Sequence, residues 1–277
     1  MKELLIENYI KQALLEDMPY GDITTDNLID SGQISKGYLL AKESGVIAGI
    51  SIFKQVFHTI DNSVLFRDYI HDGMKVNKGD ILLEIEGKTK SILKGERLAL
   101  NILQRMSGIA TLTHQFVKQV KGYQVRIVDT RKTTPNFRIF EKEAVKLGGG
   151  YNHRFNLSDA VMLKDNHIEA SGGIKAAVEK IRQHVPHTTK IEVEVENLEM
   201  LKEALEVKAD IIMLDNMSLE LMTEAVQINN HQAILEASGN MSLERVSDVA
   251  KCGVDIISVG ALTHSYRSLD ISLRFKL

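Results

Sequence analysis

Five short apolar runs decide the fold: AVMLKD (160–165), KIEVEVE (190–196), ADIIMLDN (209–216), QAILEAS (232–238) and VDIISVG (254–260). Segments with helical spacing of apolar residues separate most of them, at 174–185, 198–208, 219–228 and 242–253. A further run, VRIVDT (125–130), comes before the five. Strands that alternate with helices in this rhythm predict an α/β fold, an incomplete barrel of about six parallel strands.

The first third of the chain has another pattern. An amphipathic helix is expected at the start (1–17), followed by β segments at 37–50, 63–70 and 79–89 and a helical segment at 50–60. Short connections between these segments favour an antiparallel α+β arrangement. Residues 96–120 form a long amphipathic helix in which Ser107-Gly108 marks a place for a break.

Composition excludes several classes of protein. The 277 residues carry 34 Lys+Arg and 37 Asp+Glu, a net charge of -3, so there is no global attraction to nucleic acid or to an anionic membrane. Cys252 is the single cysteine, which excludes an intrachain disulfide and a cysteine-built zinc site. No apolar run approaches the roughly 18–20 residues of a membrane span. The acidic start lacks the apolar block of a signal peptide, so a cytoplasmic protein is expected.

Polar side chains gather where the predicted barrel strands end, the edge at which such barrels carry their chemistry. Cationic residues follow the early strands: Arg131, Lys132, Arg138, His153, Arg154 and Lys164. Acidic residues mark the middle strands at Glu194 and Asp215, and the late strands end in Ser238-Gly239 and Gly260, ahead of His264. The cations suit a small polyanion, the two carboxylates suit Mg²⁺, and the glycine-rich ends suit a phosphate.

Simpler interpretations exist for some of these features. Glu192, Glu194 and Glu196 fall on one side of a strand and could form a wet face, although three like charges repel without a cation. The stretch DGMKVNKGDILLEIEG (72–87) resembles a lipoyl or biotinyl hairpin, with Lys75 in the place of the acceptor. That interpretation would make the chain a non-catalytic carrier or binding protein, but Lys75 lacks the flanking methionine pair and a shared β scaffold is favoured.

Taken together, the motifs resemble those of the quinolinate phosphoribosyltransferase family, the decarboxylating enzymes that form nicotinate mononucleotide in NAD biosynthesis. The matching stretches run in the family's order: GDITTD (21–26), ERLALNILQRMSGIATLT (96–113), DTRKTTP (129–135), EKEAVKLGGGYNHR (141–154), KDNH (164–167), EVEVE (192–196), LDNM (214–217), EASG (236–239) and GVDIISVGALTHS (253–265). Any one of these stretches alone would be a weak signal.

The resemblance implies an N-terminal α+β sandwich domain at 1–105, joined by the tail 266–277, and a catalytic barrel at 106–265. It implies a homodimer or higher oligomer in which Arg97 enters the other subunit's site. Lys132, Lys164, Glu194 and Asp215 would be catalytic, with Mg²⁺ on the two acids. Quinolinate and phosphoribosyl pyrophosphate would contact Arg97, Arg131, Lys132, His153, Arg154, Lys164, Ser238, Gly239, Asn240, Gly260 and His264.

Two positions depart from the family pattern. Asn136 and Asn240 stand where the family usually has glycine. Asparagine tolerates left-handed backbone better than other side-chain-bearing residues, so the turns are expected to survive. Asn240 puts in doubt how closely a phosphate approaches the backbone. Two related functions remain as alternatives, a paralogue of the same fold from molybdenum operons and a nicotinate-specific transferase.

Overall fold

The structure, a computed structural model, describes residues 2–275, with the side chain of Lys2 left out. The chain divides into two compact units. One comprises the residues up to Leu112, Pro135–Gly149 and the chain from Tyr266 onward. The other comprises Thr113–Thr134 and Gly150–Ser265. Within the described range no helix is long and apolar enough to cross a membrane.

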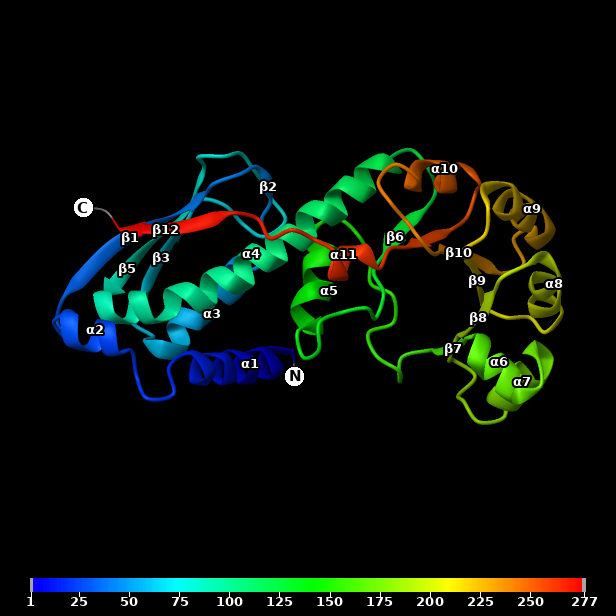
Figure 1. Ribbon diagram of the computed structural model, residues 1–277, viewed down its shortest axis with the longest axis horizontal. Coiled ribbons are helices and arrows are strands. Elements are labelled where there is room, and N and C mark those ends of the chain that lie inside the picture. The colour runs from blue at the N-terminus through cyan, green and yellow to red at the C-terminus, as the bar shows by residue number, and fades with distance from the viewer. Residues whose placement is uncertain (1, 276–277) are drawn as a thin grey trace. The chain divides into compact units, whose positions relative to one another are not determined.

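The first unit contains an antiparallel sheet of four strands in the order β12-β1-β5-β3, and a ribbon of β2 and β4. The last strand of the chain pairs with β1, as the red and blue arrows in Figure 1 show. Its elements are α1 (Lys2–Asp17), α2 (Ile23–Leu28), β1 (Ile34–Ala41), β2 (Gly45–Val46), α3 (Ile50–Ile60), β3 (Leu65–Asp68), β4 (Lys75–Val76), β5 (Ile81–Lys88), α4 (Thr89–Gln119, which continues into the second unit), α5 (Arg138–Leu147) and β12 (Ile271–Phe275).

Helix α3 shows how the sequence produces these elements. Phe53, Val56 and Phe57 recur at helical spacing and are fully buried. The Asp72 carboxylate accepts hydrogen bonds from the backbone N–H groups of Gly49 and Ile50, at 2.6 and 2.9 Å, and so satisfies donors at the start of the helix. The expected segment 50–60 therefore matches the helix observed.

Helix α4 is continuous across Ser107-Gly108, where a break could have occurred. Glycine is needed there for close packing, because a Cβ on Gly108 would lie 2.2 Å from the carbonyl oxygen of Arg267. The Ser107 hydroxyl accepts a hydrogen bond from the backbone N–H of Ala48 at 3.0 Å. Both residues thus serve contacts of the helix with neighbouring segments of the first unit.

The second unit contains a six-stranded parallel sheet in the order β6-β11-β10-β9-β8-β7, which confirms the predicted incomplete barrel. Tyr151 adds a single parallel bridge to Val128 at the free edge of β6. The elements are β6 (Arg126–Val128), β7 (Val161–Leu163), α6 (Asp165–Ser171), α7 (Ile174–Arg182), β8 (Ile191–Val195), α8 (Leu198–Glu206), β9 (Ile211–Asp215), α9 (Leu219–Asn229), β10 (Ile234–Ser238), α10 (Val246–Lys251), β11 (Ile256–Ser258) and α11 (Ala261–His264).

One face of this sheet is apolar and covered. Figure 1 shows α8 and α9 along the outer side of the strands that they connect. Leu201 of α8 and Met222 of α9 are fully buried there, together with the outward-facing strand residues Val193, Val195, Ile212, Leu214, Leu235, Ala237 and Ile257. This burial provides the hydrophobic free energy that holds the strands in register. It leaves the other face of the sheet for polar side chains.

The unit boundaries differ in detail from the division expected at residue 105. Residues 106–112 pack with the first unit, and so does the segment Pro135–Gly149, which includes α5. In α5 the buried Glu141 receives a 2.6 Å hydrogen bond from Arg105 of α4. The guanidinium of Arg105 also lies over the rings of Phe137 and Tyr266. The segment 135–149 was expected in the barrel domain because it lies between two barrel strands in the chain.

Candidate active site

Strand register gathers alternate residues of all six strands on the inner face of the second unit. Glu194 lies beside Met213, Met213 beside Glu236, and Asp215 beside Ser238. A cavity of about 780 Å³ opens at the carboxyl ends of these strands. Its lining consists of Thr130, Arg131, Lys132, His153, Arg154, Met162, Lys164, Glu194, Met213, Asp215, Asn216, Glu236, Ser238, Gly239, Asn240, Met241, Ser258, Gly260, Ala261 and His264. Apart from Arg138, the cavity therefore contains every predicted site residue of the barrel.

Two predicted residues lie outside this lining, both in the first unit of the described chain. Arg138, which was expected in the cationic group, begins α5. Arg97 lies at an exposed position of α4. Its proposed action in another subunit's site stays a prediction.

The acidic part of the cavity comes from neighbouring strands. Glu194 of β8 accepts a hydrogen bond from Lys164 Nζ at 2.9 Å and is only 12% exposed. Asp215 ends β9, and its Oδ2 accepts from the side-chain amide of Asn216 at 2.7 Å. Two carboxylates that face one cavity from adjacent strands provide the oxygen donors that Mg²⁺ prefers, so the residues present fit this ion.

Cations occupy the part of the cavity next to the first strands. Arg131 and Lys132 follow β6, and Arg154 follows the bridge residue Tyr151. The Arg154 guanidinium donates to the carbonyl oxygen of Ala160 at 3.0 Å, which fixes its direction. Burial, and then the neighbouring charge of Arg131, lowers the pKa of Arg154. Such clustering of positive charge is costly in the absence of an anion, so this region is built to receive one.

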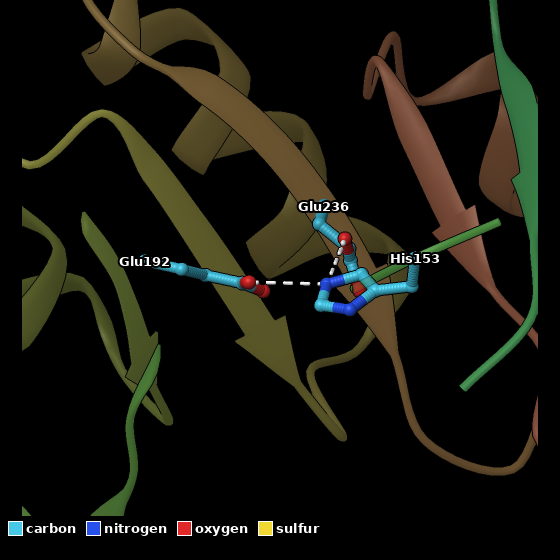
Figure 2. Close-up of side chains that lie close together, drawn as sticks. All are labelled: His153, Glu192 and Glu236. Carbon is cyan, nitrogen blue, oxygen red and sulfur yellow. Dashed lines mark hydrogen bonds and ion pairs between the residues drawn. The ribbon is translucent and has the colours of Figure 1, made fainter. Parts of the chain in front are cut away.

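His153 lies at the inner wall of the cavity between two buried glutamates (Figure 2). Its Nε2 is 3.0 Å from Oε2 of Glu192 and 3.5 Å from Oε2 of Glu236. Burial by itself would lower the pKa of His153, but the two carboxylates outweigh burial and raise it to about 10. The ring is therefore an imidazolium at neutral pH.

The two glutamates under His153 are functional candidates that had no predicted role. Glu192 and Glu236 are 2% and 0% exposed, so the wet face considered for this strand does not include Glu192. Burial, and repulsion by Glu236, raise the pKa of Glu192 against the opposing influence of His153. The cations that offset the charge of Glu192 and Glu194 are the chain's own His153 and Lys164. A carboxylate inside an apolar run, as in QAILEAS, is the signal that could have indicated this arrangement.

The glycine-rich part of the cavity lies after β10 and β11. Gly239 has φ +92°, and a Cβ there would lie 2.1 Å from Oδ1 of Asn216, so this turn requires glycine. Asn240 adopts φ 48° and its side-chain amide donates to Asn216 Oδ1 at 3.3 Å. Asn136 likewise adopts left-handed backbone, with φ 62°. The expected tolerance of asparagine at both positions is thus observed.

The helix after the glycine-rich turn of β10 starts later than its apolar pattern indicated. The expected segment was 242–253, whereas α10 begins at Val246. After β11 the four-residue helix α11 follows Gly260 directly and contains His264. The backbone of Lys132 is tied to this helix, because the Thr263 hydroxyl donates to its carbonyl oxygen at 2.9 Å.

Comparison with known proteins identifies the family of this chain. The model of the quinolinate phosphoribosyl transferase C-terminal domain matches residues 109–274, and that of the N-terminal domain matches residues 22–107. The chain belongs to the quinolinate phosphoribosyltransferase family. A family relative from Bacillus subtilis (strain 168), named probable nicotinate-nucleotide pyrophosphorylase [carboxylating], is 41% identical over 273 residues, covering 99% of this chain and 94% of its own length.

Solved structures of the family show the same fold. NadC from Streptococcus pyogenes superimposes with a TM-score of 0.94 at 44% identity, covering 98% of this chain and 97% of its own. The nicotinate-nucleotide pyrophosphorylase from Francisella tularensis gives a TM-score of 0.95 at 37% identity, covering 100% of this chain and 97% of its own. The similarity extends over both units, so the whole chain carries the family architecture.

Proposed function

We infer that this protein transfers the phosphoribosyl group of phosphoribosyl pyrophosphate to quinolinate, with loss of CO₂, and so forms nicotinate mononucleotide and pyrophosphate for NAD biosynthesis. The observation that carries this conclusion is the division of one cavity into a cationic, an acidic and a glycine-rich region in a member of this family. Each region matches one part of the reaction. The enzyme is accordingly a glycosyltransferase of the pentosyltransferase class.

The cationic region suits the diacid. Arg131, His153 and Arg154 line a part of the cavity where guanidinium and imidazolium groups can hold two carboxylates apart. Lys132 and Lys164 flank the same part, where they can also stabilise the departing pyrophosphate. We assign quinolinate and the diphosphate to these five residues.

The acidic region suits the reacting sugar. Quinolinate nitrogen forms a bond to the anomeric carbon as the bond to pyrophosphate breaks, and positive charge develops on the ribose ring between them. Glu194 and Asp215 can stabilise that charge from the cavity wall. The same two carboxylates would hold Mg²⁺, which when bound would neutralise charge on the pyrophosphate.

The second step needs no protein nucleophile. The bond between the pyridinium ring and its 2-carboxylate breaks, CO₂ leaves, and the electron pair stays on the ring carbon, which then takes a proton. Until then, the positive charge on the adjacent ring nitrogen stabilises the electron pair on this carbon. The cations of the cavity keep the two carboxylates in distinct places during the step.

The glycine-rich region suits the 5-phosphate of the sugar. Ser238, Gly239 and Asn240 follow β10, and Gly260 and His264 follow β11, all on the cavity lining. A hydroxyl, exposed amides and a histidine are suitable donors to phosphate oxygens. We assign these five residues to phosphate binding.

Two further proposals concern the assembly and its location. We propose a homodimer, or a higher oligomer built from it, in which Arg97 of one subunit completes the site of the other. We also propose a cytoplasmic location. The reducing conditions there suit a chain whose single cysteine forms no intrachain disulfide. The net charge of -3 gives no reason to expect nucleic acid or a membrane as a partner.

The alternative functions are not favoured. Relatives at about 40% identity over almost the whole chain are named nicotinate-nucleotide pyrophosphorylase [carboxylating] or quinolinate phosphoribosyltransferase. These names point neither to the molybdenum-operon paralogue nor to a nicotinate-specific transferase. Lys75, the suspected acceptor of a carrier domain, lies inside strand β4 and pairs with Val46.

One incubation tests the proposed function. Protein, phosphoribosyl pyrophosphate and Mg²⁺ are combined with quinolinate or, in parallel, with nicotinate, and nicotinate mononucleotide is measured. Quinolinate is expected to give product with a kcat/KM at least about 30-fold above that of nicotinate, because a cation that loses its buried partner costs about 2 kcal/mol or more. Lys164→Met should narrow this preference. Comparable kcat/KM for both acids would contradict the proposal.

A further inference from the structure

The cluster beneath the cavity contains more negative charge than one histidine neutralises. Glu192 and Glu236 project from β8 and β10, on either side of β9, and both are buried. Oε1 of Glu192 and both oxygens of Glu236 accept no hydrogen bond from the described residues. Buried carboxylate oxygens without hydrogen bonds are costly, so the fold retains them against a considerable penalty.

Acidic groups on three strands converge on His153. Asp129 follows β6 and is fully buried, and its Oδ1 accepts a hydrogen bond from the backbone N–H of His153 at 2.9 Å. Its Oδ2 accepts from the side-chain amide of Asn152 at 2.6 Å. The ring of His153 is contacted by Glu192 and Glu236 at the Nε2 end. Backbone and ring are therefore fixed separately, which sets both the position and the rotation of the imidazole.

We propose that Glu236, together with Glu192, is a positioning residue that holds the His153 ring, as a cation, at the cavity wall for contact with a carboxylate of the diacid substrate. This rests on the proposed function. Both glutamates contact the same ring nitrogen, as Figure 2 shows, so the Nδ1 side of the ring is turned away from them. A carboxylate accepts only, so Nε2 carries a hydrogen, and with that nitrogen engaged the ring can rotate only by breaking the contact.

A bound cation is the competing explanation for the same atoms. One atom from each of His153, Glu192 and Glu236 lies within 4.8 Å of the others. The 3.0 Å contact from Nε2 to Glu192 is of hydrogen-bond length, and a metal ion would have to replace that hydrogen. Glu192 and Glu236 contact the ring itself, Asp129 contacts the backbone of His153, and Arg154 is next in the chain. The positive ring already supplies a cation to this set.

The test compares Glu236→Gln, which keeps the shape and removes the charge, with Glu224→Gln at an exposed position of α9. Quinolinate Kd is measured by calorimetry, and the KM values of both substrates are measured in the product assay. Glu236→Gln should weaken quinolinate about 10- to 100-fold, the range for one hydrogen bond to a charged group, and change the KM of phosphoribosyl pyrophosphate by less than about twofold. Glu224→Gln should change neither.

A double-mutant cycle shows whether Glu236 acts through the histidine. In a His153→Asn background, Glu236→Gln should change the quinolinate Kd by less than about twofold. An equal loss in both backgrounds, a loss of both substrates alike, or an unchanged quinolinate Kd would each overturn the proposal. If Glu236→Gln fails to fold, Glu236→Met provides the same comparison, since it replaces the buried charge with an apolar side chain of similar volume and leaves His153 paired with Glu192.

Two further measurements separate this proposal from its alternatives. Metal analysis of the purified wild-type protein should find no stoichiometric transition metal that Glu236→Gln loses; finding one would overturn the proposal and assign the three residues to a metal site. If the wild-type protein forms no nicotinate mononucleotide, the proposed function fails. If it forms product and Glu236→Gln binds quinolinate normally, only the positioning role fails.

Discussion

At the scale of single residues, two cations of the cavity are paired with acids of the same chain before any substrate arrives. Lys164 contacts Glu194, and His153 contacts Glu192. Asp215 differs from these acids, since its hydrogen bond comes from the neutral amide of Asn216. Its carboxylate is therefore available to whatever enters the cavity.

Asp215→Asn removes this charge while preserving the shape of the side chain. Turnover should fall by about 100-fold or more, the usual loss when one group that stabilises transition-state charge is removed. Quinolinate Kd should change by less than about twofold, because the cations that hold the acid are untouched. Turnover is followed over a Mg²⁺ titration. Near-full activity at any Mg²⁺ concentration would show that Asp215 neither holds the metal ion nor stabilises the charge on the ribose.

His153 gives the protein a defined dependence of stability on pH. Its pKa in the folded chain is about 10, above the ordinary 6.5, because the two carboxylates outweigh burial. Its charged form therefore stabilises the fold fully below pH 6.5, and this stabilisation is lost as the pH rises through about 10. The raised pKa of Glu192 acts with the same sign at lower pH.

The measurement is the free energy of unfolding between pH 6 and pH 10, from denaturant titrations. His153→Asn should be less stable than wild type near pH 6, and the difference should shrink as the pH approaches 10. His187→Asn, at an exposed position, serves as the control and should follow the wild-type curve throughout. A constant difference across the range would mean that His153 does not titrate as proposed.

At the scale of elements, the ends of neighbouring strands are locked to each other. The turn after β10 places Gly239 against Asn216, which follows β9. The backbone N–H of Asn216 donates to the carbonyl oxygen of Ser238 at 3.1 Å, and Asn240 donates to the Asn216 side chain. The proposed phosphate region is thus connected, through Asn216, to the carboxylate of Asp215.

Gly239→Ala tests this connection. The added Cβ would lie 2.1 Å from Asn216 Oδ1, and left-handed backbone costs a side-chain-bearing residue about 1–2 kcal/mol. Gly122→Ala is the matched control, since Gly122 also has positive φ, at +101°, but its Cβ would meet nothing within 4 Å. Both variants should lose a similar amount of backbone stability by thermal unfolding.

Only Gly239→Ala should raise the KM for phosphoribosyl pyrophosphate, by about tenfold or more if one charged hydrogen bond is displaced. An unchanged KM for phosphoribosyl pyrophosphate in Gly239→Ala would show that this turn does not contribute to phosphate binding.

At the scale of the whole molecule, the proposed dimer makes a prediction that no single chain can satisfy. Arg97→Ala and Lys164→Ala should each be inactive alone, because every site lacks one of the two residues. Mixed subunits form hybrids in which one of the two sites has both residues intact, so random exchange should restore about a quarter of wild-type activity. Subunit exchange is verified with distinguishable tags. Absence of complementation after verified exchange would place Arg97 in the site of its own chain.

Local sequence determined much of this protein by itself. The alternation of apolar runs and amphipathic segments indicated the parallel barrel, because periodicity depends only on near neighbours in the chain. The polar residues after each run indicated the cavity edge, because all strand ends of a parallel sheet meet there. Asn136 and Asn240 were expected to take left-handed backbone, and both do.

Tertiary structure alone decided how the charges are paired. His153 and Glu192 are 39 residues apart in the chain. Glu236 lies on β10, which the sheet order places two strands away from β8. The alternating glutamates of the strand at 190–196 would look the same in the sequence whether their face of the sheet were exposed to water or buried. Its burial depends on which strands close the sheet and which loop covers it, and these are long-range contacts that no short stretch of sequence encodes.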